Sequence, residues 1–137
     1  MSRPKGKTSA ALLEKMLDEA SWLLSHAQAL GDYGRYGEAA AEQARAAAAE
    51  EDVACLLDAD GQEREAAIHR VSAASCYEKL GQNPRAVTLL RAALSASLYD
   101  DHRARVEQQL ARCLAQAQKE LSQLAKRGKR KQTTAVP

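Results

Sequence analysis

The chain has no phenylalanine, a single isoleucine and only five valines among its 137 residues, but it has 29 alanines and 17 leucines. Alanine and leucine favour helices, whereas strands favour β-branched and aromatic residues. A β-rich fold is therefore excluded. The length allows one domain with a core of modest size. The hydrophobic and charged fractions, 45% and 28%, are those of a folded chain. We expect an all-α fold.

Long hydrophobic runs are also lacking. No stretch of about 18 apolar residues occurs, which excludes a membrane span. Residues 1–7 are basic, but Glu14, Lys15, Asp18 and Glu19 interrupt the segment that follows, so no signal-peptide hydrophobic region is present. We expect a cytoplasmic protein with no membrane partner.

The chain has only three cysteines, and their spacing matches no paired motif. Cys55, Cys76 and Cys113 are odd in number and show no Cys-x-x-Cys spacing. This excludes both a disulfide framework and a zinc knuckle. Because free cysteine is among the most buried residue types, we expect all three as small core residues.

Motifs that carry catalysis are missing. His26, His69 and His102 fall on separate expected helices without metal-binding spacing, so we expect structural or surface histidines. No phosphate-binding loop or nucleophile elbow occurs. The glycines of residues 31–37 link two helices and indicate a turn, and residues 58–61 match only part of a calcium loop. We expect neither enzyme activity nor a cofactor or metal.

Apolar residues recur at helical spacing between a few glycine and proline breaks. Gly81 is expected to end a helix in the left-handed conformation, and Asn83 with Pro84 to start the next one. The expected helices span residues 9–30, 35–57, 62–80, 84–98 and 100–124. We expect a folded domain over residues 9–126 between two disordered basic segments, residues 1–8 and 127–137.

Two segments of the chain are similar to each other. Gly34 is preceded by Ala27 and followed by Ala46, and Gly81 is preceded by Ala74 and followed by Ala93, at equal spacings. Small residues at such positions let antiparallel helices approach closely. The pattern resembles the tetratricopeptide repeat, whose packing residues are matched by two sets: Leu23, Ala27, Leu30, Gly34, Tyr36, Ala39 and Ala46, and Ala74, Tyr77, Leu80, Gly81, Ala86, Leu90, Ala93 and Leu94.

The two glycines stand 47 residues apart, against a repeat of about 34 in that family. We assign the excess to a longer second helix and its turn, residues 50–62. The resemblance implies helical hairpins with a long C-terminal capping helix and a concave groove lined by the first helix of each pair. The implied groove residues are Ser21, Leu24, Gln28, Asp32, Ile68, Val71, Ser75, Lys79, His102, Arg105, Gln109 and Arg112. The lysine and asparagine set that grips a peptide carboxylate in some family members is not supplied.

Charge is unevenly distributed. Residues 8–62 contain 11 acidic and 3 basic side chains, whereas residues 99–137 contain 9 basic and 4 acidic ones. Five cations crowd the C-terminal segment: Lys126, Arg127, Lys129, Arg130 and Lys131. Such a segment attracts phosphate through counterion release, although no aromatic residue accompanies it for base stacking.

The sequence therefore indicates a non-enzymatic interaction module, an adaptor, scaffold or chaperone-like protein that binds a protein or peptide in an apolar or mixed groove. The alternative is a nucleic-acid-associated helical protein that uses the basic tail. Leu121 and Leu124 have no evident cover within the chain, which indicates a homodimer through the C-terminal helix as a further interaction.

Overall fold

The computed structural model describes residues 7–134, with side chains for residues 10–130. This part of the chain forms five α-helices and no strand, which confirms the all-α prediction. The helices are α1 (Lys7–Asp32), α2 (Tyr36–Ala59), α3 (Glu63–Lys79), α4 (Asn83–Leu94) and α5 (Asp100–Thr134). No helix within residues 7–134 has the length and apolar character needed to cross a bilayer.

One turn geometry joins the first four helices. Gly34, Gly61 and Gly81 all have positive φ, at 76°, 77° and 75°. In each turn the amide after the glycine donates to the carbonyl oxygen five residues earlier, as Gln82 does to Tyr77 at 2.8 Å. This is the Schellman arrangement, which only glycine adopts cheaply. The sequence comparison paired the turns at Gly34 and Gly81, and the structure adds Gly61 as a third copy.

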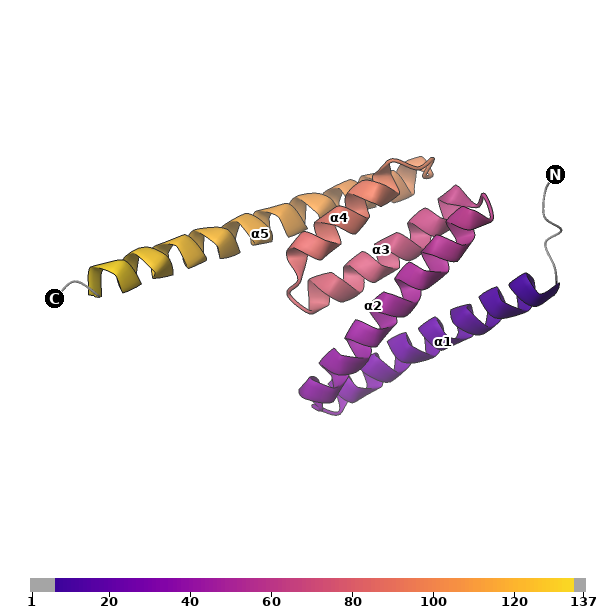
Figure 1. Ribbon diagram of the computed structural model, residues 1–137, viewed down its shortest axis with the longest axis horizontal. Helices are drawn as coiled ribbons and strands as arrows, with labels where there is room; N and C mark the ends of the chain where they lie inside the picture. The colour runs from indigo at the N-terminus through magenta and orange to yellow at the C-terminus, as the bar shows by residue number, and fades with distance from the viewer. Residues whose placement is uncertain (1–6, 135–137) are drawn as a thin grey trace.

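The helices pack in chain order, each mainly against its neighbours in sequence. Figure 1 shows α2 between α1 and α3, followed by α4 and α5. Alanines make these interfaces close, since Ala46, Ala74 and Ala86 have no exposed surface and Ala27 is only 3% exposed. The short side chains thus lie between helices, as the sequence pattern predicted.

The two helical hairpins differ in length. The second helix of the first pair, α2, has 24 residues, whereas its counterpart α4 has 12. We predicted that α4 would reach residue 98, but it ends at Leu94. Arg103 donates to the carbonyl oxygen of Leu94, at the helix end, and to that of Ala96 in the connection, at 3.1 and 2.9 Å. Leu98 is buried all the same, in the connection to α5.

Helix α5 projects beyond the other helices (Figure 1). Asn83 Nδ2 donates to Glu120 Oε1 at 3.2 Å, near the point where the bundle ends. All side chains of residues 121–130, the α5 extension, are exposed. We expected order to end at residue 126, but the helix continues to Thr134. The lysines, arginines and glutamine of residues 126–132 are good helix formers.

Most of the expected N-terminal disordered segment, residues 1–6, lies outside the described chain, as do residues 135–137.

The cysteines divide into two classes. Cys76 and Cys113 are buried, as expected, whereas Cys55 is exposed, so its assignment to the core was wrong. Cys55 lies nine positions after Ala46, and at 100° per residue this places it on the opposite side of α2. Burial raises the pKa of Cys76 and raises that of Cys113 to about 11. The three thiols therefore differ in accessibility.

Candidate functional site

A groove of about 320 Å³ lies between α3 and the start of α5. Its aliphatic part comes from Ile68 and Val71 on α3, from Leu98 in the α4–α5 connection, and from Val106 on α5. Ile68 is 37% exposed, whereas Leu98 and Val106 are nearly buried. The groove thus offers an apolar floor that solvent reaches.

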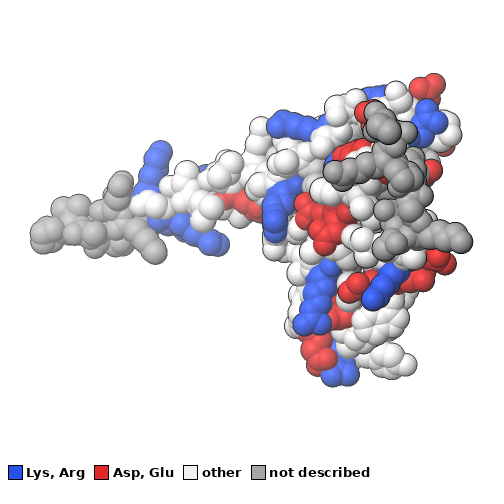
Figure 2. All heavy atoms as spheres, turned by 45° about the vertical axis from the view of Figure 1, so that its right-hand side comes forward, with Lys and Arg blue, Asp and Glu red and all other residues white. Residues whose placement is uncertain are grey.

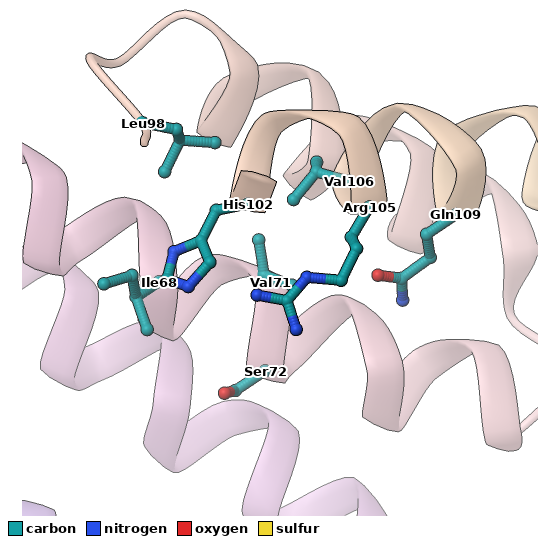
Figure 3. Close-up of a pocket in the computed structure, with 8 residues that line it drawn as sticks. All are labelled: Ile68, Val71, Ser72, Leu98, His102, Arg105, Val106 and Gln109. Carbon is teal, nitrogen blue, oxygen red and sulfur yellow. The ribbon is translucent and has the colours of Figure 1, made fainter. Parts of the chain in front are cut away.

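Polar side chains line the same groove. In Figure 3, His102 and Arg105 extend from α5 toward α3, with the imidazole beside Ile68 and the guanidinium toward Ser72. The Arg105 side chain is 69% exposed and lies 3.9 Å from Asp101, a separation at which an exposed ion pair holds the cation only weakly. The rim therefore presents a positive charge next to an apolar floor.

Polar contacts close one end of the groove. Gln109 Nε2 donates to Ser75 Oγ at 3.0 Å, and the Arg112 guanidinium donates to both carboxylate oxygens of Glu78 at 2.7 and 3.0 Å. This bidentate bond with Arg112 holds the pKa of Glu78 below its ordinary value. These contacts fix the spacing between α3 and α5.

The other end is fixed by an arginine. Arg64 Nε, on α3, donates to the Ser97 carbonyl oxygen at 2.7 Å, and its guanidinium lies 4.2 Å from the Tyr99 ring centroid. The connection that supplies Leu98 is therefore tied to the first turn of α3. Both ends of the groove are held by hydrogen bonds, so its apolar floor is preformed.

Only some of the groove residues that the sequence predicted lie in the α3–α5 groove. Ile68, Arg105 and Gln109 line the α3–α5 groove, together with Val71 and His102. Ser75 and Arg112 lie at its polar end. The sequence missed the groove residues Ser72, Leu98 and Val106. Leu98 could not be found by helical spacing, because it lies in a connection between two helices.

The residues predicted on α1 do not join this groove. Leu24 packs against the main core, and Gln28 donates to Asp32 on the same helix at 3.0 Å. Gln28 lines a separate hollow with Lys79. Gln28 and Lys79 thus meet, as the sequence predicted, but this hollow shares no lining residue with the α3–α5 groove, so the predicted residues fall in two separate places.

Two histidine–carboxylate pairs bind α2 to its neighbours. His26 Nδ1 on α1 lies 2.8 Å from Glu42 Oε2, and His69 Nδ1 on α3 lies 2.6 Å from Glu50 Oε2. Both carboxylates are buried, and the hydrogen bond with His26 lowers the pKa of Glu42. The pairs occupy different helix interfaces, and no metal-binding cluster forms within residues 7–134. Each histidine thus takes part in packing between two helices.

A tyrosine also joins α2 and α3. The Tyr77 hydroxyl donates to Glu51 Oε2 at 2.6 Å, and the Arg85 guanidinium lies 4.6 Å from the Tyr77 ring centroid. Burial, with help from this hydrogen bond, raises the pKa of Tyr77 to about 12. The hydroxyl is therefore a hydrogen-bond donor at neutral pH and holds the interface.

A second open hollow lies on the outer face of α1 and α2. It is lined by Met16, Glu19, Trp22, Leu23, Arg45, Ala48, Ala49 and Asp52, and its volume is about 560 Å³. Trp22 is 59% exposed and stacks on His26, with ring centroids 4.7 Å apart. This hollow was not predicted, although the exposed tryptophan and the alanines of α2 are the residues that form it.

The α5 extension carries the predicted basic residues. Lys126, Arg127, Lys129 and Arg130 are exposed on one helix, whereas the Lys131 side chain lies outside the described residues. On the face shown in Figure 2, blue side chains lie on the projecting helix and most red ones on the body of the molecule.

Comparison with protein-family models, with curated protein sequences and with solved structures gives no match to this chain.

Proposed function

We propose that this chain is a cytoplasmic, non-enzymatic interaction module of tetratricopeptide-like hairpins, an adaptor or scaffold that binds a partner protein. The α3–α5 groove carries the proposal, because it combines an open aliphatic floor with a cationic rim and preformed ends. The buried alanines between the helices and the repeated glycine turns support the resemblance to that family.

The side chains that line the groove indicate which kind of partner segment it would bind. Ile68 and Val71 offer contact to a leucine- or valine-sized side chain, while Arg105 offers a bond to a carboxylate beside it. We infer an acidic, amphipathic peptide as the occupant. Because the Arg105 side chain is largely exposed, its contribution falls as salt increases.

A displayed random-peptide library, selected on the full chain, tests this function. We expect enriched peptides to combine an aliphatic residue with nearby Asp or Glu. Fluorescence anisotropy with the most enriched peptide then compares variants. Ile68→Glu should abolish binding, and Arg105→Gln should weaken it and remove most of its salt dependence.

Ala92→Glu is the matched control, since Ala92 is exposed on α4 and does not line the groove. It should bind like the unaltered chain. Circular dichroism establishes that each variant is folded, and Ile68 is exposed enough for the charge to be tolerated. Equal enrichment on the Ile68→Glu protein would contradict the assignment.

A further inference from the structure

An apolar stripe of α5 continues into the α5 extension, where no part of the described chain covers it. Leu114, Ala117, Leu121 and Leu124 recur at steps of three and four, so they share one side of the helix. Leu114 packs against the core, whereas Leu121 and Leu124 are 65% and 60% exposed. The stripe therefore leaves the bundle and continues into solvent, with basic residues beyond it.

The hollow on α1 and α2 has the opposite character. Met16, Trp22 and Ala49 give it an apolar surface, and Glu19 and Asp52 give it carboxylates. Neither carboxylate belongs to an ion pair within the described side chains. Arg45 also lines the hollow, but its charge is paired with Glu42 at 2.8 Å. Alanines on α2 leave room for another helix to approach closely.

The two surfaces lie at opposite ends of the helix order. Helix α1 packs mainly against α2, and α5 packs mainly against α4, so each end of the helix order leaves one face without a neighbouring helix. One end carries a protruding helix with leucines and cations, and the other an apolar hollow with anions. We propose that the α5 extension of one molecule docks in the α1–α2 hollow of a second copy.

Charge favours this head-to-tail contact over pairing of two α5 helices. Residues 8–62 contain 11 acidic and 3 basic side chains, whereas Glu120 is the one acidic residue between positions 108 and 134. Two α5 helices side by side would bring cations together, which repel each other. An extension in the hollow places its cations next to Glu19 and Asp52 instead.

The contact joins two different surfaces, so each molecule in a pair keeps one free extension and one free hollow. Association of this heterologous kind continues beyond the dimer unless the rotation closes a ring. This differs from the homodimer through the C-terminal helix that the sequence indicated. It also uses a surface separate from the α3–α5 groove, so either proposal can fail alone.

Sedimentation equilibrium of the full chain over a range of concentrations and salt tests the proposal. The weight-average mass should rise past that of a dimer, and more strongly at low salt. The extension variant Leu121→Gln/Leu124→Gln and the hollow variant Glu19→Lys/Asp52→Lys should each raise the dissociation constant at least about tenfold.

Mixing the two variants gives the decisive measurement. The extension variant retains an intact hollow, and the hollow variant retains an intact extension, so an equimolar mixture should form a dimer and stop there. The double variant Glu14→Lys/Asp18→Lys has the same charge change on exposed positions outside the hollow and is the control. It should associate more strongly than the hollow variant.

Three results overturn the proposal. One is a chain that is monomeric at every concentration. If that monomeric chain binds a labelled DNA duplex through its basic extension, the extension serves nucleic acid and not a second copy. Another is self-association of the hollow variant equal to that of the unaltered chain, which indicates pairing through α5. The third is a variant mixture that contains only monomers.

Discussion

His26 Nδ1 and Glu42 Oε2 lie 2.8 Å apart and join α1 to α2 around a carboxylate that is only 7% exposed. Arg45 donates to the other oxygen of the same carboxylate at 2.8 Å. Buried charges are tolerated when they are paired and hydrogen-bonded. Glu42 therefore couples the packing of the first hairpin to the protonation of one side chain.

Acid should destabilise the protein partly through Glu42. Its pKa in the folded chain lies below the ordinary value of 4.5, so the unfolded chain binds the proton more readily. The free energy of unfolding consequently rises with pH in this range, and the contribution is lost as pH falls below 4.5 through the folded-state pKa. Urea unfolding from about pH 6 to about pH 3 measures the slope.

Glu42→Gln should flatten this pH dependence without removing it, because the pKa of Glu78 is also lowered, by Arg112. Glu14→Gln, an exposed change on α1, should retain the original slope. A Glu42→Gln protein with the unaltered slope would show that this pair does not contribute.

Replacing glycine by alanine should destabilise the protein at a turn with positive φ and not at a glycine within a helix. Gly81 has a φ of 75° and no atoms near the position a Cβ would take, so Gly81→Ala costs backbone strain alone, about 1–2 kcal/mol. Gly37 has equally open surroundings but no positive φ, so Gly37→Ala should cause no loss. Urea unfolding compares the two, and equal stabilities would contradict the strain argument.

Close approach of the helices predicts intolerance of larger side chains. Ala74 has no exposed surface, so Ala74→Leu should reduce the free energy of unfolding by about 1–3 kcal/mol through overpacking. Ala92 is exposed on α4, and Ala92→Leu serves as the control with the same change in volume. An unchanged unfolding midpoint for Ala74→Leu would contradict close packing at this interface.

Thiol labelling should distinguish Cys55 from the other cysteines. A thiol reagent at neutral pH should modify Cys55 in the folded chain, while Cys76 and Cys113 react only on unfolding. Burial acts twice on these two, because it blocks access and raises their pKa, and the thiolate is the reactive form. Mass spectrometry of native and urea-treated protein counts the labels, and more than one in the native state would refute this reading.

Local patterns predicted much of the helical organisation. The alanine spacing and the glycine breaks place the helices to within a few residues and put Ala27 and Ala74 between them, because these features depend on backbone geometry and side-chain volume. The turn at Gly61 was predicted, but its likeness to the other two was not, although Leu57 precedes it and Ala66 follows it at the spacings found around Gly34.

The candidate site was less accessible to such reasoning. Leu98 reaches the groove from a connection whose path depends on Arg64 and Arg103, and neither contact has a local sequence signal. Cys55 was also wrongly predicted from local information. Its residue type favours burial, but it lies on the exposed side of α2. The split between Gln28 and Ile68 follows from how the hairpins stack, which spacing within one helix does not determine.

Packing in chain order also bears on how the molecule assembles. Since each helix rests mainly on the one before and the one after it, most native contacts join residues close in sequence. Such low contact order favours rapid folding that spreads from any stable pair of helices. Detaching α1 breaks mainly its interface with α2, and detaching α5 breaks its contacts with α4 and α3, so we expect protection against hydrogen exchange to increase from the end helices toward the alanine-rich centre.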